Sequence, residues 1–169
     1  MKPLGLAFAL LLLATAAHAN DGTHFRAKLA GTHEVPALFN PGDAVFSARV
    51  LDDDSRIDFE LTYENLTGPP AAAHVHLGQR GVNGGVSFFL CGGGGKPPCP
   101  ASPSGTITGT VVATDVIGPT TQGITAGDLA AIIAMMRAGI TYANMHTARF
   151  PGGEIRGQLR GRDHSDDDD

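Results

Sequence analysis

The most regular alternation of apolar and polar side chains in this chain is Arg56-Ile57-Asp58-Phe59-Glu60-Leu61-Thr62-Tyr63. Because neighbouring side chains of a β-strand point to opposite faces, this pattern predicts a strand with one buried face and one solvated face. Residues 43–51 alternate in the same way, and the aspartate-rich residues 52–55 between the two segments suit a turn. The two segments therefore predict an antiparallel hairpin.

Other short segments with the composition of strands lie on both sides of this hairpin. They are residues 25–31, 71–77, 86–90, 105–112, 140–145 and 154–160, and residues 116–117 are predicted to close a hairpin with the 105–112 strand. Glycine and proline separate them, since the chain has 23 Gly and 11 Pro among 169 residues. About eight short strands of this kind predict an all-β fold, a Greek-key antiparallel β-sandwich or barrel.

A single segment has the pattern of a helix. Residues 129–138 are rich in Ala, Ile and Met, and Gly139 follows them as a stop signal. The preceding Thr125-Ala126-Gly127-Asp128 has the spacing of a capping box with Asp128 in its fourth place. We therefore expect one short helix inserted near one end of the β fold.

The first residues of the chain predict export. A charged Lys2 precedes an apolar run over residues 4–14, and Ala17-His18-Ala19 has the small residues of a signal-peptide cleavage site. The apolar run is too short for a permanent membrane span and no later segment approaches it. We expect a secreted or periplasmic protein, with residues 1–19 as a signal peptide, 20–161 as one domain and 162–169 as an acidic disordered tail.

Charge and cysteine content narrow the functional classes. The net charge is −5 and the sequence shows no basic patch for nucleic acid. Cys91 and Cys99 are the only cysteines, and in an oxidising compartment they are predicted to form a disulfide. Closing so short a loop contributes about 2–3 kcal/mol through its effect on the unfolded state. A cysteine-based metal site would need a second pair of thiols.

Three of the seven histidines lie in two short apolar segments, Ala73-His74-Val75-His76 and Asn144-Met145-His146-Thr147. In a strand, His74 and His76 point to the same face, with Cα atoms roughly 6.5 Å apart. A third imidazole from His146 would complete a set of ligands for copper or zinc with one coordination position open. His33, in a loop, is a further candidate ligand.

Nitrogen ligands without a thiolate favour Cu(II), with zinc as the runner-up. Each metal-bound imidazole needs a partner for its second N–H, and Glu34 and Glu154 are the predicted carboxylate partners. These two residues have an alternative role as ion-pair partners of Arg156, which could itself steer an anion to the open metal position. A metal-free cluster, in which the imidazoles are hydrogen-bonded to the glutamates and stiffen the sheet, is the competing interpretation.

Three separate motifs, in this order along the chain, resemble the CHRD domain, a family named for its occurrence in chordin. They are Gly31-Thr32-His33-Glu34-Val35-Pro36, Ala73-His74-Val75-His76 with the glycines of residues 78–85, and Tyr142-Ala143-Asn144-Met145-His146-Thr147 with residues 151–159. The resemblance spans about residues 23–161. It implies an exported β-sandwich that serves as a binding or matrix module, with motif positions at Glu34, His74, His76, His146, Glu154 and Arg156.

A narrower resemblance links His74-Val75-His76 to the copper strand of copper-zinc superoxide dismutase, which also has a Greek-key barrel with a loop disulfide. The other histidines and the aspartate of that enzyme's zinc site have no counterparts here, so a dismutase-type oxidoreductase ranks third and no catalytic residue is predicted. The leading hypothesis is a non-enzymatic exported protein that binds a transition metal, copper first, for storage, delivery or sequestration. The runner-up is a metal-free extracellular module that binds a protein partner or matrix.

Overall fold

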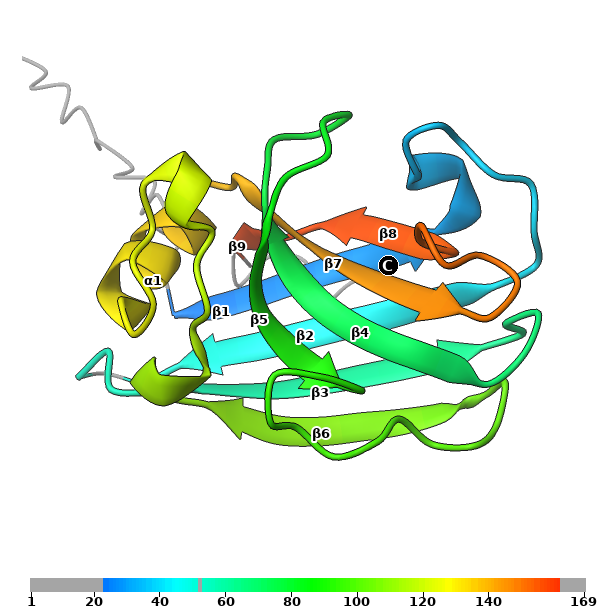
Figure 1. The fold of residues 1–169 in the computed structure, drawn as a ribbon, viewed down its shortest axis with the longest axis horizontal. Helices are drawn as coiled ribbons and strands as arrows, with labels where there is room; N and C mark the ends of the chain where they lie inside the picture. The colour runs from blue at the N-terminus through cyan, green and yellow to red at the C-terminus, as the bar shows by residue number, and fades with distance from the viewer. Residues whose placement is uncertain (1–22, 52, 162–169) are drawn as a thin grey trace, which may run out of the picture.

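Residues 23–51 and 53–161 are described by the structure, a computed structural model (Figure 1). In chain order its elements are β1 (His24–Ala30), η1 (Gly31–His33), β2 (Asp43–Val50), β3 (Ile57–Glu64), β4 (Pro70–Leu77), β5 (Val86–Cys91), β6 (Gly105–Val111), η2 (Ala113–Asp115), η3 (Thr120–Gln122), α1 (Leu129–Arg137), β7 (Thr141–Thr147), β8 (Ile155–Gln158) and β9 (Arg160–Gly161). No helix among these elements has the length and apolar character needed to cross a membrane. The predicted signal peptide, residues 1–19, and acidic tail, residues 162–169, lie outside the described residues.

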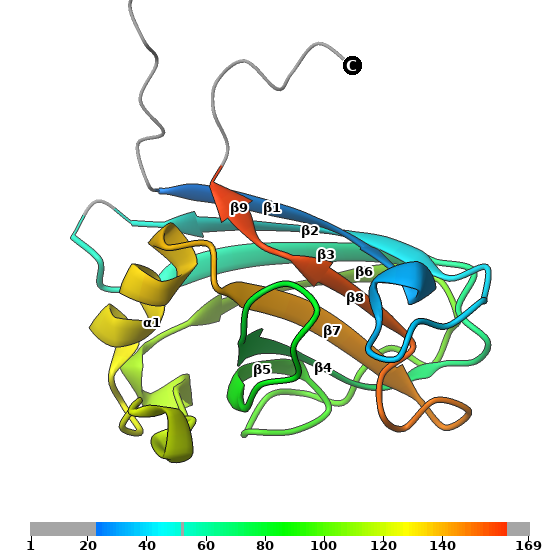
Figure 2. The same cartoon turned by 90° about the horizontal axis from the view of Figure 1, so that it is seen from above.

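The strands form one antiparallel sheet in the order β5-β4-β7-β8-β1-β2-β3-β6, and β9 pairs with β1. The sheet folds over on itself, so that β4, β5 and β7 lie across the core from β1, β2 and β3 (Figures 1 and 2). Its two end strands, β5 and β6, also lie close to each other, and the sheet is therefore an almost closed barrel. This architecture confirms the predicted all-β sandwich or barrel.

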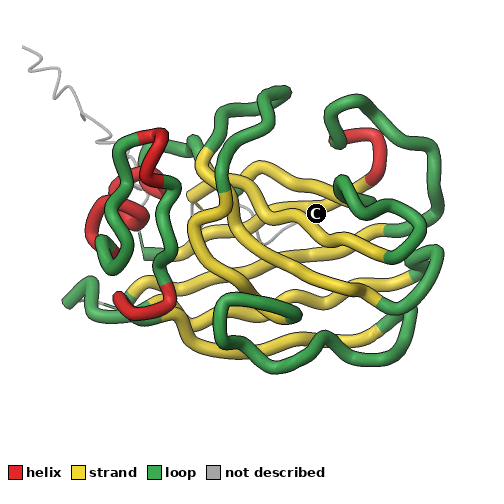
Figure 3. The backbone as a smooth tube through the Cα atoms, in the orientation of Figure 1, coloured by secondary structure: helices red, strands yellow, loops and turns green. Residues whose placement is uncertain are grey.

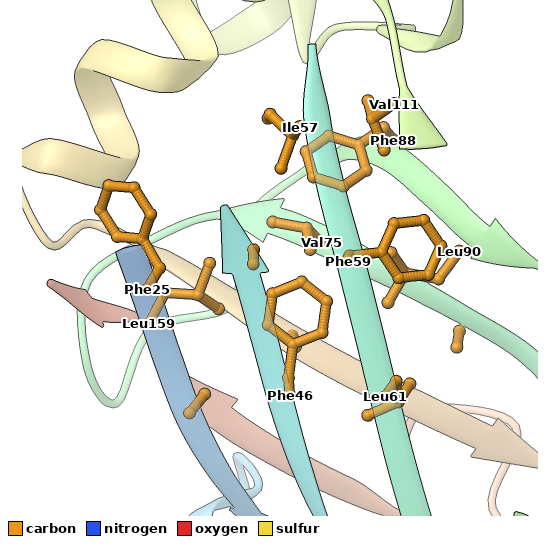
Figure 4. Close-up of a cluster of buried hydrophobic side chains, with 14 of the residues drawn as sticks. Phe25, Phe46, Ile57, Phe59, Leu61, Val75, Phe88, Leu90, Val111 and Leu159 are labelled. Carbon is orange, nitrogen blue, oxygen red and sulfur yellow. The ribbon is translucent and has the colours of Figure 1, made fainter. Parts of the chain in front are cut away.

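The predicted hairpin is formed by β2 and β3, which pair along their whole length. Their apolar side chains point into the barrel, where the rings of Phe46 and Phe59 stack with centroids 6.2 Å apart. Figure 4 shows these rings among core side chains from other strands, including Val75 and Phe88. All four side chains are almost completely buried. Burial of the apolar face thus holds the hairpin against the strands that carry the histidines.

Helix α1 covers one end of the barrel (Figure 3). Its N-cap is Asp128, whose carboxylate accepts a hydrogen bond from the backbone N–H of Ala131. The helix is confirmed, but the predicted capping box is wrong because Asp128 is itself the cap and not the fourth residue of a box that begins at Thr125. The side chains that attach the helix to the core are Leu129, Ile132, Ile133 and Met136.

The predicted strand at residues 116–117 does not form. After β6, the chain turns through η2, where the Asp115 carboxylate accepts a hydrogen bond from the backbone N–H of Val112. Val116 then enters the core, and the backbone N–H of Ile117 donates to the carbonyl of Ser87 in β5. The segment therefore bonds to β5 and to the backbone N–H of Gly127, before α1, instead of pairing with β6.

Cys91 and Cys99 form the predicted disulfide, with Cα atoms 5.0 Å apart. The glycine-rich loop between them lies directly against the ring of Phe89. A Cβ atom at Gly93 would lie 2.4 Å from this ring, so the loop can approach it only with glycine at this position. The disulfide loop thereby covers an aromatic ring that also contacts the histidine cluster described next.

Candidate metal centre

The pairing of β4 with β7 brings the three predicted histidines together. In this pair Ala72 is opposite His146, and His74 is opposite Asn144. The side chains of His74, His76 and His146 lie on the outer face of the barrel. Val75, between the first two histidines, and Met145, next to His146, point the other way and are buried in the core. Strand alternation thus separates the histidines from the core side chains.

The three imidazoles are close enough to share an ion. One ring nitrogen from each residue lies within 4.8 Å of the others. The closest approach is 2.7 Å, between Nδ1 of His74 and Nε2 of His76. The ring centroids of His74 and His146 are 4.4 Å apart. We refer to these three residues as the histidine triad.

Backbone carbonyls orient two of the triad rings. Nδ1 of His76 lies 2.9 Å from the Gly84 carbonyl, and Nδ1 of His146 lies 3.0 Å from the Pro151 carbonyl. A carbonyl oxygen can only accept a hydrogen bond, so in both rings Nδ1 carries the hydrogen and Nε2 carries the lone pair. Nε2 of His146 is buried and has no hydrogen-bond partner among the described residues.

Burial keeps the triad neutral. Desolvation, reinforced by the neighbouring imidazoles, lowers the pKa of His74 to about 3. Desolvation also lowers the pKa of His76 to about 4, against the opposing effect of the Gly84 carbonyl. The pKa of His146 is lowered by the same cause. Near neutral pH all three rings therefore present unprotonated nitrogens, the form in which histidine binds metals.

Aromatic rings surround the triad. The ring of Phe89 meets His74 edge-on, with centroids 5.0 Å apart. The ring of Tyr142 stacks on His76 with centroids 4.6 Å apart and an angle of 2° between the planes. The Tyr142 hydroxyl accepts a hydrogen bond from the backbone N–H of Gly84, the same residue whose carbonyl binds His76. Tyr142 and Gly84 together hold the His76 ring in place.

Sequence reasoning did not identify Tyr142, Gly84 or Phe89 as part of this site. A signal for Tyr142 was present, because it precedes His146 by four residues and therefore lies on the same face of the strand. Gly84 had a weaker signal as one glycine among several in residues 78–85. A Cβ atom at Gly84 would lie 1.6 Å from the Leu77 carbonyl oxygen, so this position requires glycine.

The predicted carboxylate partners bind elsewhere. Glu34 accepts a hydrogen bond from the Asn144 side chain, and burial raises its pKa against the opposing effects of this bond and of the Arg156 charge. Glu154 accepts hydrogen bonds from Thr67 and Thr147. Within the described part of the chain, neither carboxylate hydrogen-bonds a triad imidazole, because the carbonyls of the adjoining loops already occupy that place.

Arg156 and His33 also lie outside the triad. The Arg156 guanidinium packs 3.6 Å above the centroid of the Tyr142 ring and donates hydrogen bonds to Asn83 and to the carbonyls of Gln79 and Val82. It therefore holds the loop that carries Gly84, and it forms no ion pair with a described carboxylate. Nδ1 of His33 lies 3.2 Å from the Arg156 carbonyl.

Comparison with protein-family models matches residues 25–159 to the CHRD domain. No curated protein and no solved structure matches the chain. The matched residues contain all three triad histidines, both cysteines and every strand from β2 to β8.

Proposed function

The chain belongs to the CHRD domain family, and from the geometry within that domain we propose that the histidine triad binds a transition-metal ion. Copper is the favoured ion and zinc the runner-up. The bound metal would be stored, delivered or sequestered in an exported protein. The predicted leader and the disulfide are consistent with an oxidising compartment outside the cytoplasm.

The observation that carries this proposal is the buried Nε2 atom of His146. An unsatisfied buried polar atom costs about 1–3 kcal/mol, so such atoms call for a specific explanation. His146 offers one ring nitrogen within 4.8 Å of nitrogens from His74 and His76, and Nε2 is the nitrogen available to an ion because Nδ1 already lies against the Pro151 carbonyl. A metal ion between them would satisfy His146 and would also bind the lone pair of His76.

The type of ligand favours copper. The triad offers three imidazole nitrogens and no thiolate, and such nitrogen ligands bind Cu(II) more tightly than other divalent ions of the first transition row. Zinc is the runner-up because imidazole is also one of its usual ligands.

One observation favours the alternative, a metal-free binding or matrix module. Nδ1 of His74 can carry a hydrogen and donate it to Nε2 of His76 across the same 2.7 Å. In that state the imidazoles of His74 and His76 would be joined by a hydrogen bond that stiffens β4. His146 would still lack a partner for its Nε2 atom, and this difference favours the metal site.

The test is a Cu(II) titration of the metal-free protein against a competing chelator. We expect one tightly bound equivalent, with nitrogen hyperfine splitting in the electron paramagnetic resonance spectrum. The His74→Gln/His76→Gln variant should lose this site. The matched control, His33→Gln/His164→Gln, removes two histidines that are not in the triad and should keep it. Equal copper affinity in the two variants would refute the proposal, and displacement of Cu(II) by equimolar Zn(II) would reverse the order of metals.

A further inference from the structure

A groove of about 480 Å³ lies on the outer face of β1 and β8. Its basic side chains come from β1, β8, β9, η1 and the 78–85 loop. We call it the basic groove and define it by Arg26, Lys28, His33, Arg80, Arg156 and Arg160. None of the three triad histidines lines it.

Positive charge is concentrated in the basic groove although the chain as a whole is acidic. The sequence has 12 Lys and Arg, of which Lys2 and Arg162 lie outside the described residues, leaving ten. Five of these ten line the groove, and Glu34 is its one carboxylate among the described residues. The chain as a whole has a net charge of −5, whereas the groove lining carries more positive than negative side chains.

Most of the groove cations have no counter-charge among the residues that the structure describes. Elsewhere, Arg56, Lys96 and Arg137 pair with aspartates. Within residues 23–51 and 53–161, no carboxylate pairs with the exposed cations of the groove, which are Arg26, Lys28, Arg80 and Arg160. Unpaired cations at this density would attract anions from solution.

The strand register places like charges of the groove next to each other. Arg26 in β1 is directly opposite Arg160 in β9. Like charges placed directly opposite each other on neighbouring strands destabilise a sheet. Arg26 and Lys28 are two residues apart and point to the same face of β1. The fold therefore holds three cations together at a cost that a bound anion would offset.

Arg80 is held over the basic groove by its neighbours. The buried Arg156 guanidinium donates hydrogen bonds to the carbonyls of Gln79 and Val82, on either side of Arg80. The loop is fixed in this way, while the Arg80 side chain itself remains exposed. Positive charge thus faces the groove from the loop as well as from the strands.

We propose that the basic groove binds a small polyanion that carries at least two carboxylate or phosphate groups. Its volume lies within the range of roughly 300–1,000 Å³ that is usual for small-molecule sites. Its cations come from separate elements, so that they suit several anionic groups on one ligand better than a single charge. The residues are scattered between positions 26 and 160, which is why the sequence shows no basic patch.

The test is isothermal titration calorimetry of the metal-free full chain near neutral pH and at low ionic strength, where charge interactions are least screened. The probes are citrate, pyrophosphate, acetate and, as a macromolecular polyanion, heparin. We expect one-to-one binding of citrate or pyrophosphate and none of acetate, and comparison of the first two distinguishes carboxylate from phosphate ligands. The bound anion should also raise the melting temperature.

Two variants that remove the same amount of charge distinguish the effect of the groove residues from the effect of net charge. Arg26→Gln/Arg160→Gln should weaken polyanion binding by about tenfold or more, the loss expected when charged hydrogen bonds are removed. Arg56→Gln/Arg149→Gln changes the net charge equally and should bind like the wild type. If the first variant folds poorly, Arg80→Gln, at an exposed loop position, replaces it with the same expected direction.

Three results would overturn the proposal. The first is that neither citrate nor pyrophosphate binds. The second is an equal loss of binding in the two charge-matched variants. The third is tight binding of heparin without binding of citrate or pyrophosphate, which would indicate a macromolecular polyanion. Copper affinity should be unchanged in Arg26→Gln/Arg160→Gln. The proposal for the groove and the proposal for the triad can therefore be refuted separately.

Discussion

Nδ1 of His76 lies 2.9 Å from the carbonyl oxygen of Gly84, and on the other side of the ring Nε2 of His76 lies 2.7 Å from Nδ1 of His74. The orientation of a strand histidine thus depends on a glycine eight residues away, in the loop that follows the strand. In metal sites, such hydrogen bonds to the second ring nitrogen tune affinity by about 10–100-fold. The relationship leads directly to a prediction about Gly84.

Gly84→Ala should weaken Cu(II) binding by about tenfold or more. A Cβ atom at this position would lie 1.6 Å from the Leu77 carbonyl oxygen, so the loop must move and the hydrogen bond to His76 must break. The measurement is the Cu(II) dissociation constant from chelator competition. Gly68→Ala is the matched control, since a Cβ atom there would meet nothing within 4 Å. Wild-type affinity in Gly84→Ala would show that the Gly84 contact does not position the ligand.

Tyr142→Phe should lower the free energy of unfolding by about 1–2 kcal/mol, because it leaves the backbone N–H of Gly84 without its acceptor. Copper affinity should fall as well, since Gly84 then holds His76 less firmly. The measurements are urea denaturation and copper competition. Tyr63→Phe, whose hydroxyl donates to the Ser102 carbonyl on another part of the barrel, should leave copper affinity unchanged. Equal copper affinities in the two variants would contradict the role assigned to Tyr142.

Acid should destabilise the metal-free protein through the triad. The pKa values of His74 and His76 are lowered from 6.5 to about 3 and about 4. Between pH 6.5 and 4 the unfolded chain therefore binds more protons than the folded one, and the free energy of unfolding falls as the pH is lowered. Over this window each of the two histidines accounts for a loss of about 3 kcal/mol, or roughly 6 kcal/mol together.

The variant His74→Gln/His76→Gln tests this assignment. Neither glutamine titrates in this window, so the slope of unfolding free energy against pH should be shallower than in the wild type. Urea denaturation at a series of pH values provides the measurement. Identical slopes in the wild type and the variant would mean that other groups cause the acid sensitivity.

Glu154→Gln should destabilise the fold but leave copper affinity unchanged. The buried carboxylate accepts hydrogen bonds from the backbone N–H and hydroxyl of Thr67 and from the hydroxyl of Thr147. An amide group places a donor where these donors already point, at a cost of about 1–3 kcal/mol. The measurements are denaturation and copper competition. Loss of copper binding without loss of stability would restore the carboxylate as a partner of the metal ligands.

Much of the β architecture could be predicted from local sequence. The alternation that predicted the β2–β3 hairpin also placed His74 and His76 on one face and Val75 on the other. Such assignments depend only on the period of the strand and on which side chains avoid water. Local pattern was less reliable at the ends of elements, where Asp128 replaced Thr125 as the cap of α1 and residues 116–117 did not form a strand.

Hydrogen-bond partners could not be predicted in the same way. Carboxylates were expected beside the imidazoles, but the carbonyls of Gly84 and Pro151 lie there instead. Every residue has a carbonyl group, so a sequence contains no specific signal for one that will orient a distant ring. The basic groove was hidden for a related reason, since its cations come from segments far apart in the chain.

Residue type and spacing were sufficient to identify His74, His76 and His146 as candidate ligands and to predict the all-β fold around them. Their convergence on one point depended on the order of the strands, which places β7 beside β4 and aligns Ala72 with His146. The packing of the whole barrel sets this order and register, because a one-residue shift between strands would turn buried side chains out to solvent. The tertiary structure alone therefore decided that three histidines separated by up to 72 residues form one site.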